Sequence, residues 1–250
     1  MFSLSIVWRW VFWAFSILSL LPGACFPPRP QTSPPLKVGV CTSFRPLVDE
    51  IARTGLWNLE VAEGPSQFII RGFEAGEFDL VIVAVPLPEA TIIARDALAI
   101  IVHPGNSVNS LTLEELRRIY AGYVWDWSLL GGKGEVVIVS REEGSGARAF
   151  FEENVMKGER LSPAAVVIPS SREVLDYVAL RAGAIGYISA SWLNKKVKAV
   201  LVEGKAVSSP DYPLKLPAYA ASRTEAGFKF IEFLKGPVGR RILSERYFLP

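Results

Sequence analysis

The sequence predicts an α/β protein in which mainly parallel sheets are flanked by helices. Two observations support this fold class. Apolar runs of strand length alternate with longer segments whose apolar residues recur at helical spacing. One of these runs, Asp79–Val85 (DLVIVAV), is continuously apolar after its first residue, as expected for a strand buried on both faces of a parallel sheet. Half of the 250 residues are hydrophobic, which is enough to build a core.

The predicted elements follow one another from Leu36 to the C-terminus. Strands are predicted at Leu36–Cys41, Leu59–Ala62, Asp79–Val85, Ala97–Val102, Val136–Ser140, Val166–Pro169, Ile185–Ile188 and Val197–Val202. Helices are predicted at Phe44–Thr54, Ser66–Ala75, Leu113–Tyr120, Ala147–Val155, Ser171–Ala182, Phe228–Leu234 and Val238–Glu245. Three helix starts have a hydroxyl residue available as N-cap, namely Ser43, Ser66 and Thr112. Because helical segments separate most strands, the strands are expected to pair in parallel.

Residues 1–24 have the pattern of a secretory signal peptide. Arg9 is their only charged residue, Val11–Leu21 is an apolar run, and small residues stand directly before Cys25. A cysteine after Gly-Ala is similar to a bacterial lipoprotein cleavage site, so Cys25 is the predicted lipidation site, although the usual leucine stands one position early. The alternative is an uncleaved anchor helix over Leu4–Leu21. Both interpretations place the folded part outside the cytoplasm, in the periplasm or at the outer face of the cell membrane.

Residues 25–35 are predicted to form a semi-rigid tether between membrane and folded part, because half of Phe26–Pro35 is proline. The chain has two cysteines, and with Cys25 lipidated, Cys41 has no partner for a disulfide. Cys41 is expected to be a small buried hydrophobic residue. No Cys/His metal site can be built from these residues, and no cofactor is expected.

The charge balance gives no reason to expect a nucleic-acid partner. The chain carries 27 basic and 25 acidic residues, and loss of residues 1–24 would remove only Arg9 from this count. A nearly neutral chain has no surplus of basic residues for nucleic acid or for an anionic membrane surface. Any preference for an anion must therefore come from a local site.

Three segments share one design, in which an apolar strand leads into a short loop with a hydroxyl residue and then into a helix. The loops carry Thr42 with Ser43, then Ser66, and then Ser145. In parallel sheets such loops gather at the carboxyl ends of the strands, where ligands bind. Each helix start offers free backbone N–H groups and partial positive charge. Several helix starts around one pocket would form an anion site without a large net charge.

The loop Arg141–Gly146 (REEGSG) has the most specific anion-binding chemistry of the three. Gly144 and Gly146 permit a tight loop and a close approach of the backbone to a ligand. Ser145 supplies a hydroxyl group, and Arg141 can form a bidentate, charge-assisted pair with a tetrahedral oxyanion. Taken alone, a Gly-Ser-Gly loop is more often only a turn before a helix.

Further motifs extend the pattern beyond this loop. They are VHPGNSVNSLTLEELRRIYAG at 102–122, WDWSLLGG at 125–132, VIVSREEGSGARAFFEE at 137–153, GAIGYI at 183–188, YPL at 212–214 and the ending FIEFLKGPVGRRILSERYFLP. In these motifs and their order, nearly everything after Leu36 resembles the phosphate-binding proteins of ABC importers. The resemblance implies a two-lobed, periplasmic-binding-protein-like type II fold. Each lobe would be a mainly parallel sheet flanked by helices, and a two-strand hinge would let the lobes close over ligand.

The same resemblance implies how the chain is divided between the lobes. The first lobe is expected to comprise residues 36–102 plus 201–250, and the second lobe residues 103–200. The crossing strands are expected near Ala99–Pro104 and Val197–Val202. Closure would bring the hydroxyl residues of the first lobe onto the Arg141 loop and expel water, which strengthens each hydrogen bond to the anion.

The predicted binding residues come from matching positions one by one. Arg141, Ser145 and Gly146 match phosphate contacts of the family's second lobe. Ser43 and Ser66 match the hydroxyl residues at its first two helix starts. The set is completed by Thr42, which precedes Ser43, and by Ala147, whose backbone N–H is available.

Two positions depart from the family pattern. Ala147 stands where threonine is usual, so one hydroxyl group is lost. Ala84 lies in a stretch where phosphate-specific members often place an aspartate or serine, and the aspartate accepts a proton from bound phosphate. Without that acceptor, discrimination between protonated phosphate and sulfate-like dianions is in doubt.

The resemblance implies a monomeric, non-enzymatic lipoprotein that captures an oxyanion and delivers it to an ABC transporter permease. Phosphate is the first choice for that oxyanion. Two alternatives stay open. The first is a non-transport surface or sensory protein of the same fold with a degenerate site. The second is a receptor for another oxyanion, such as sulfate, molybdate or tungstate.

A serine hydrolase is a weaker alternative. His103, the only histidine, lies in a His-Pro-Gly sequence typical of a loop, and the Gly-Ser-Gly stretch lacks the spacing of a nucleophile elbow. Trp125 and Trp127 are expected to pack in a surface loop rather than to stack on a ligand. Glu142 and Glu143 are expected to be solvated, with repulsion of anions at the rim of the site as the alternative.

Overall fold

The structure is a computed structural model that describes residues 34–250. Its strands are β1 (Leu36–Cys41), β2 (Leu59–Gly64), β3 (Leu80–Val83), β4 (Thr91–Val102), β5 (Ser110–Leu111), β6 (Val137–Arg141), β7 (Val166–Ile168), β8 (Ala184–Ser189), β9 (Lys198–Ala199), β10 (Leu201–Val202) and β11 (Lys215–Ser222). Its α-helices are α1 (Arg45–Arg53), α2 (Ser66–Glu74), α3 (Leu113–Tyr120), α4 (Gly146–Phe151), α5 (Ser171–Ala179), α6 (Glu225–Lys235) and α7 (Pro237–Ser244). Short helical turns lie at η1 (Thr42–Phe44), η2 (Trp127–Leu130), η3 (Glu152–Met156, a π-turn) and η4 (Ala190–Trp192).

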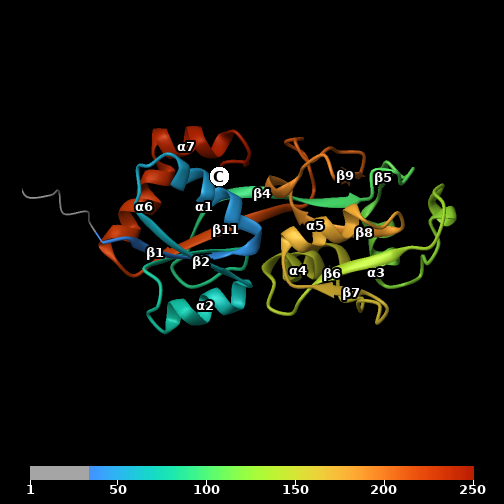
Figure 1. Ribbon diagram of the computed structural model, residues 1–250, viewed down its shortest axis with the longest axis horizontal. Helices are drawn as coiled ribbons and strands as arrows, with labels where there is room; N and C mark the ends of the chain where they lie inside the picture. Colours follow the sequence, from blue (N-terminus) through green and yellow to red (C-terminus); the bar gives the residue numbers. More distant parts are fainter. Residues whose placement is uncertain (1–33) are drawn as a thin grey trace, which may run out of the picture. The chain divides into compact units, whose positions relative to one another are not determined.

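The described residues form two α/β lobes that share one sheet (Figure 1). In the first lobe, β1 lies between β2 and β3, and both pairings are parallel. In the second lobe, β6 lies between β7 and β8, again in parallel. The strands β11 and β4 join these parallel trios, and their pairings with β3, with each other and with β8 are antiparallel. The predicted two-lobed α/β fold is therefore present, with a mixed sheet at the junction.

β4 passes from one lobe into the other. Its first half pairs with β11 as far as Ala97, and its second half pairs with β8 from Leu98 onward. Only the apolar second half was predicted, because Arg95 and Asp96 interrupt the apolar pattern of the first half. β11 was not predicted at all, since Pro217 lies inside it and proline argues against an interior strand.

The predicted strand Val197–Val202 is two shorter strands. β9 pairs antiparallel with the end of β4, and β10 pairs in parallel with β5 in a separate two-stranded sheet. Val200 lies between them, with its N–H bonded to Ile100 O at 3.0 Å. The residue boundaries of the lobes, at 102/103 and 200/201, stay a prediction.

Of the three predicted helix N-caps, Thr112 is confirmed, and Ser66 and Ser43 are not. Thr112 caps α3 in a capping box, in which its hydroxyl accepts the Glu115 N–H and the Glu115 side chain accepts the Thr112 N–H. Ser66, predicted as a cap, is instead the first residue of α2 and follows Pro65. Ser43, also predicted as a cap, lies within the turn η1, and Phe44 precedes α1.

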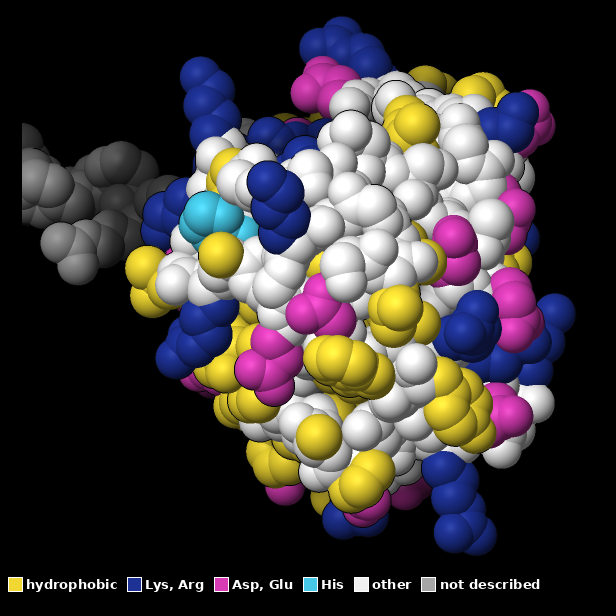
Figure 2. Space-filling view, turned by 90° about the vertical axis from the view of Figure 1, so that its right-hand side faces the viewer, with side chains coloured by type: hydrophobic (Ala, Val, Ile, Leu, Met, Phe, Trp, Pro, Cys, Tyr) yellow, Lys and Arg dark blue, Asp and Glu magenta, His cyan; other side chains and the backbone are white. Residues whose placement is uncertain are grey.

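The far end of the second lobe carries the turn η2, drawn in yellow-green in Figure 1. Trp127 is fully buried there, and its indole N–H donates to Gly183 O at 2.9 Å, so this tryptophan packs as predicted. Trp125 is 67% exposed. Figure 2 shows this end of the molecule, where apolar side chains lie among acidic and basic ones rather than in a field of one sign.

Among residues 34–250, no helix is long and apolar enough to cross a membrane. The predictions for the signal peptide at residues 1–24, for lipidation of Cys25 and for most of the tether at 25–35 lie outside the described residues.

Candidate functional site

The predicted anion-binding residues lie where the two lobes meet. Thr42 follows the carboxyl end of β1, and Ser66 begins α2 in the first lobe. Arg141 ends β6, and Ser145 caps α4 in the second lobe. All four are buried, at 5% exposure or less, together with Ser43. The carboxyl ends of strands in both lobes therefore place these groups at one location, as the strand–loop–helix design predicted.

Direct contacts show how closely the two lobes approach each other. Arg141 Nη2 donates to Thr42 Oγ1 at 2.8 Å, across the junction. The backbone N–H of Gln67 donates to Gly144 O at 3.1 Å. A Cβ atom at Gly146 would lie 2.5 Å from Ser66 Oγ and 2.7 Å from the Cβ of Ala84, so a residue without a side chain is required there.

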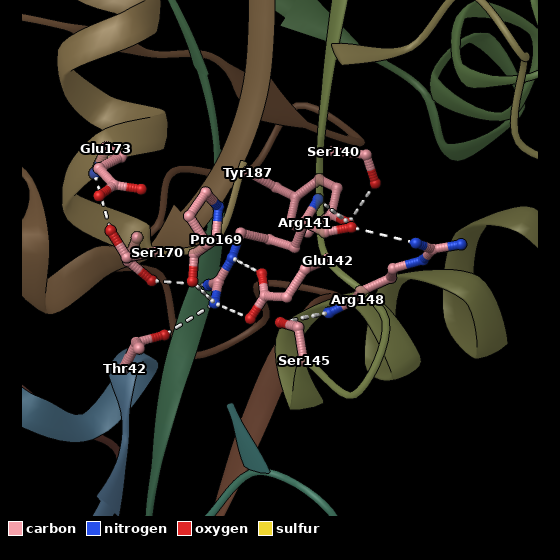
Figure 3. A network of polar contacts seen from close by, with 11 residues as sticks. Thr42, Ser140, Arg141, Glu142, Ser145, Arg148, Pro169, Ser170, Glu173 and Tyr187 are labelled. Atoms are coloured by element: carbon pink, nitrogen blue, oxygen red, sulfur yellow. Dashed lines mark hydrogen bonds and ion pairs between the residues drawn. The ribbon is translucent and has the colours of Figure 1, made fainter. Parts of the chain in front are cut away.

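Arg141 is the centre of this arrangement (Figure 3). Its side chain is 1% exposed, and it is among the largest fully buried side chains of the described residues. Besides Thr42, the guanidinium donates to Ser171 Oγ at 3.1 Å and to Pro169 O at 3.3 Å. It also donates through Nε and Nη2 to the two carboxylate oxygens of Glu142, at 2.8 and 2.9 Å. A buried cation needs such partners, because burial without them is strongly unfavourable.

The pairing of Glu142 with Arg141 corrects the prediction that Glu142 is solvated. Its side chain is only 19% exposed, and both oxygens face the guanidinium. Glu143 is exposed, as predicted. The sequence could not separate the two acidic neighbours, because a loop conformation with Gly144 at a φ of 84° decides which one turns inward.

The buried side chain of Tyr187 contacts the backbone of Arg141 and the neighbouring Ser140. Tyr187 Oη accepts the Arg141 N–H at 3.3 Å and lies 2.9 Å from the Ser140 hydroxyl. The Tyr187 ring stacks on Phe151 of α4, with the ring centroids 4.4 Å apart. Burial raises the pKa of Tyr187 to about 12, so the phenol stays a neutral hydrogen-bonding group. Tyr187 therefore positions the end of β6 on the second lobe.

Helix N-termini from both lobes open toward this region. Ser145 caps α4 by accepting the Arg148 N–H at 3.4 Å, and Ser170 caps α5 by accepting the Glu173 N–H at 3.1 Å. Ser66 Oγ at the start of α2 accepts the Ala84 N–H at 3.4 Å. Such helix starts carry partial positive charge, which favours an anion beside Arg141.

Several residues of this site were missed by the sequence interpretation. Ser171 contacts Arg141, Gln67 contacts the Gly144 loop, and Trp192 Nε1 donates to Thr42 O at 2.9 Å. The signal for Ser171 was present, because the strand before Pro169 leads through Ser170 into a helix, in the same design as the other three segments. Nothing in the local sequence marks Trp192.

Two predicted deficits of the site are visible in the structure. Ala84 is 4% exposed and fully buried Ala147 is the second residue of α4, so both lie at the junction without an acceptor or hydroxyl. Their backbone N–H groups are retained, and that of Ala84 is already bonded to Ser66. The stretch before Pro86 thus offers no carboxylate for a protonated ligand.

A hollow of about 460 Å³ adjoins the start of α4. Gln67 and Val85 line it from the first lobe, and Gly144, Ser145 and Arg148 line it from the second. Ser145 therefore borders this hollow. Arg141 does not line it and is almost completely buried.

Three further titratable side chains, those of Cys41, His103 and Glu63, make local contacts. Among the described residues, no group of three or more His, Cys, Asp and Glu side chains could hold a metal ion. Cys41 is buried, as predicted, and burial raises the pKa of its thiol. His103 Nδ1 accepts the Gly105 N–H at 3.0 Å, which is a contact within its own loop. Burial raises the pKa of Glu63, and the Arg45 guanidinium 3.6 Å away opposes that shift.

Two α/β lobes that place helix N-termini and a buried guanidinium at their junction define a two-lobed ligand-binding protein. The chain belongs to the family described as the PBP superfamily domain, whose model matches residues 45–234.

Curated relatives in this family are phosphate-binding proteins. The chain is 29% identical over 169 residues to the phosphate-binding protein PstS of Bacillus subtilis, covering 63% of this chain and 56% of that protein. It is 33% identical over 138 residues to phosphate-binding protein PstS 2 of Streptococcus agalactiae, covering 47% of this chain and 46% of that protein. The chain therefore spans about half the length of the curated relatives it matches.

Solved structures agree over most of the described residues. A protein assigned as a phosphate ABC transporter substrate-binding protein from Clostridium perfringens, solved with bound phosphate, aligns with a TM-score of 0.80 at 28% identity. That alignment covers 87% of this chain and all of the other. An ABC-type phosphate transport receptor from Vibrio cholerae aligns with a TM-score of 0.67 at 26% identity, covering 86% of this chain and all of the other. These likenesses confirm the two-lobed binding-protein fold.

Proposed function

We propose that the protein is an extracytoplasmic solute-binding lipoprotein that captures an oxyanion for an ABC importer, with phosphate as its preferred ligand. One observation carries the proposal: a buried arginine lies where helix N-termini of both lobes converge. Arg141 is 1% exposed, and the starts of α2, α4 and α5 lie around it with serine residues at or beside each start. A fixed guanidinium together with helix-start N–H groups is the arrangement that binds tetrahedral oxyanions.

The names of the relatives support phosphate as the ligand. PstS of Bacillus subtilis is named a phosphate-binding protein, and the Clostridium perfringens structure contains bound phosphate. The importer, the permease partner and the monomeric state belong to the proposal. No enzymatic step is proposed, because the site presents donors and hydroxyl groups without an activated nucleophile.

Titration of the full chain, purified in detergent micelles, tests the ligand. We expect phosphate to release heat in a saturable calorimetric titration and to bind more tightly than sulfate, molybdate or tungstate. Tighter binding of one of those three would keep the receptor role and change the ligand. Absence of saturable heat with all four oxyanions would rule out the proposed capture function.

A second candidate is a non-transport surface or sensory protein of the same fold. It is favoured by one observation, the lack of an acceptor at Ala84 and of a hydroxyl at Ala147. A millimolar dissociation constant for phosphate would support this candidate, since a transport receptor must capture its ligand from dilute solution.

Lipid anchoring through Cys25 is part of the proposal and has its own test. Radiolabelled palmitate should be incorporated into the wild-type chain in bacteria and lost in Cys25→Ser. The matched control is Cys41→Ser, because Cys41 is buried in the folded part. Labelling that persists in Cys25→Ser would exclude this anchor.

A further inference from the structure

Trp192 reaches from the second lobe into the first. It ends the turn η4, which directly follows β8, and its indole Nε1 donates to Thr42 O at 2.9 Å. The Thr42 hydroxyl accepts from Arg141 Nη2 at 2.8 Å. The second lobe therefore holds Thr42 at two points, by its backbone oxygen and by its side chain.

The turn that carries Trp192 is fixed to the strand that joins the lobes. The Ser191 N–H donates to Asp96 Oδ2 at 3.0 Å, and the Ser189 hydroxyl donates to the same oxygen. Asp96 is buried in β4, beside the point where this strand changes partner from β11 to β8. Because η4 is anchored there, the indole N–H has a fixed place from which to hold Thr42.

A cation holds the indole ring on one face. The guanidinium carbon of Arg172 lies over the Trp192 ring, 5.1 Å from its centroid, which is the distance of a cation–π contact. Arg172 is exposed and is the second residue of α5, next to the Ser171 hydroxyl that accepts from Arg141. The ring is thus held by the same helix start that contacts the central guanidinium of the site.

The turn that Trp192 contacts leads into the first helix start of the site. The turn η1 begins with Thr42, contains buried Ser43 and is followed directly by α1. No side chain caps the start of α1, so its first backbone N–H groups are available to an anion rather than to a capping residue. Movement of η1 away from the second lobe would carry these donors away from Arg141.

We propose that Trp192 is a positioning residue for anion capture, whose indole N–H holds the turn η1 against the second lobe and slows release of the bound oxyanion. The inference rests on the proposed function and deepens it. The bond joins the two lobes and does not include the ligand, so it stabilises the closed form with any anion. It forms only after the lobes have met, so it acts on dissociation and leaves association unchanged.

The main test compares Trp192→Phe with the matched control Trp125→Phe, at a tryptophan that is 67% exposed. Trp192→Phe keeps an aromatic ring and removes the N–H donor. The full chain is loaded with radiolabelled inorganic phosphate and chased with unlabelled phosphate. Dissociation should be about fivefold faster in Trp192→Phe, from the loss of one hydrogen bond, with an unchanged association rate. Trp125→Phe should match wild type in both rates.

Two results of this test overturn the inference alone: unchanged dissociation in Trp192→Phe, or a loss of affinity that comes from slower association. If wild type retains no labelled phosphate and binds no other oxyanion, the proposed function has failed and the inference with it. The ratio of phosphate to sulfate affinity separates positioning from direct contact. This ratio should be the same in wild type and Trp192→Phe, and a changed ratio would mean that the indole binds the anion itself.

A second variant leaves the indole N–H in place and loosens the ring. Arg172→Ala removes the cation over Trp192 at an exposed position, and dissociation of phosphate should become about twofold faster. Arg181→Ala is the matched control, because Arg181 is also exposed and lies over a ring, that of Tyr177, 3.6 Å from its centroid. Arg181→Ala should release phosphate as wild type does. Equal dissociation rates in Arg172→Ala and wild type would contradict the claim that the ring must be held in place.

Discussion

The two sides of the candidate site are built from different chemistry. The second lobe contributes the buried cation, Arg141, together with Ser145 and Ser171. The first-lobe groups in contact with that loop, Thr42 and Ser66, are uncharged hydroxyl residues. Under the proposed function, we therefore expect the second lobe to supply the charge and most of the affinity for an anion. We expect the first lobe to complete the hydrogen bonds to the anion.

The largest expected effect is the loss of charge from the second lobe. Arg141→Ala should weaken phosphate binding by about a hundredfold or more, since removing a buried charge-assisted partner costs about 3 kcal/mol. Calorimetry measures the affinity, and Arg141→Lys should fall between wild type and alanine, because it keeps the charge without the two-point geometry.

The matched control for this change is Arg181→Ala. Arg181 is exposed and lies over the Tyr177 ring, 3.6 Å from its centroid, away from the site. Equal loss of affinity in Arg181→Ala and Arg141→Ala would show that general charge, rather than the second-lobe guanidinium, attracts the anion. Melting curves of both variants establish that each is folded.

Substitution of a site residue in the first lobe is expected to lower the affinity for phosphate by a smaller factor. Thr42→Val keeps the shape of the side chain and removes the oxygen that accepts from Arg141 at 2.8 Å across the junction. Loss of one hydrogen bond of this kind should weaken phosphate binding by about fivefold, since its net value is about 1 kcal/mol. Thr54→Val is the control, because Thr54 directly follows α1, and its hydroxyl donates to Ile51 O and accepts the Leu56 N–H. A larger effect in Thr42→Val than in Arg141→Ala would reverse the proposed division between the lobes.

The sequence predicted the parts of the site that depend on local patterns. The strand Leu36–Cys41, the helix Leu113–Tyr120 and the Arg141 loop followed from an apolar run, the N-cap Thr112 and a glycine–serine loop, and the structure has all three. Such features are set by interactions between residues close in the chain, so a single sequence carries them.

Contacts between distant segments were beyond sequence reasoning. The inward turn of Glu142 depends on the fold of its loop, and the Trp192 bond to Thr42 O joins residues 150 positions apart. β11 also depends on distant partners, because a strand containing Pro217 is stabilised by β3 and β4 on its two sides. Each of these features needs the tertiary structure to be known first.

The smallest expected effect on binding concerns the strand that joins the lobes. Asp96 lies in β4 beside the change of partner from β11 to β8, and its carboxylate accepts from the Ser189 hydroxyl and from the Ser191 N–H at 3.0 Å. Burial raises the pKa of Asp96 to about 6, above the value of about 3.9 for an unfolded chain. Folding therefore favours the protonated acid, and this contribution is complete below about pH 4 and is lost as pH rises through 6.

Thermal or urea unfolding at a series of pH values measures this linkage. Between pH 4 and pH 7, wild type should lose up to about 3 kcal/mol of stability relative to Asp96→Asn, from a shift of about two pKa units. Asp211→Asn, at an exposed position, should track wild type. Phosphate affinity at pH 7 should change little in Asp96→Asn. A large change in the phosphate affinity of Asp96→Asn would mean that β4, and not only the binding residues of the two lobes, determines the affinity.

Hydrogen exchange with and without phosphate tests most directly whether one anion is shared by both lobes. Mass spectrometry of the full chain should show phosphate-dependent protection of backbone amides at residues 41–47 and 64–69 of the first lobe. The same phosphate concentration should protect residues 141–148 and 170–173 of the second lobe. Protection confined to one lobe, or absent from the Arg141 loop, would contradict the account.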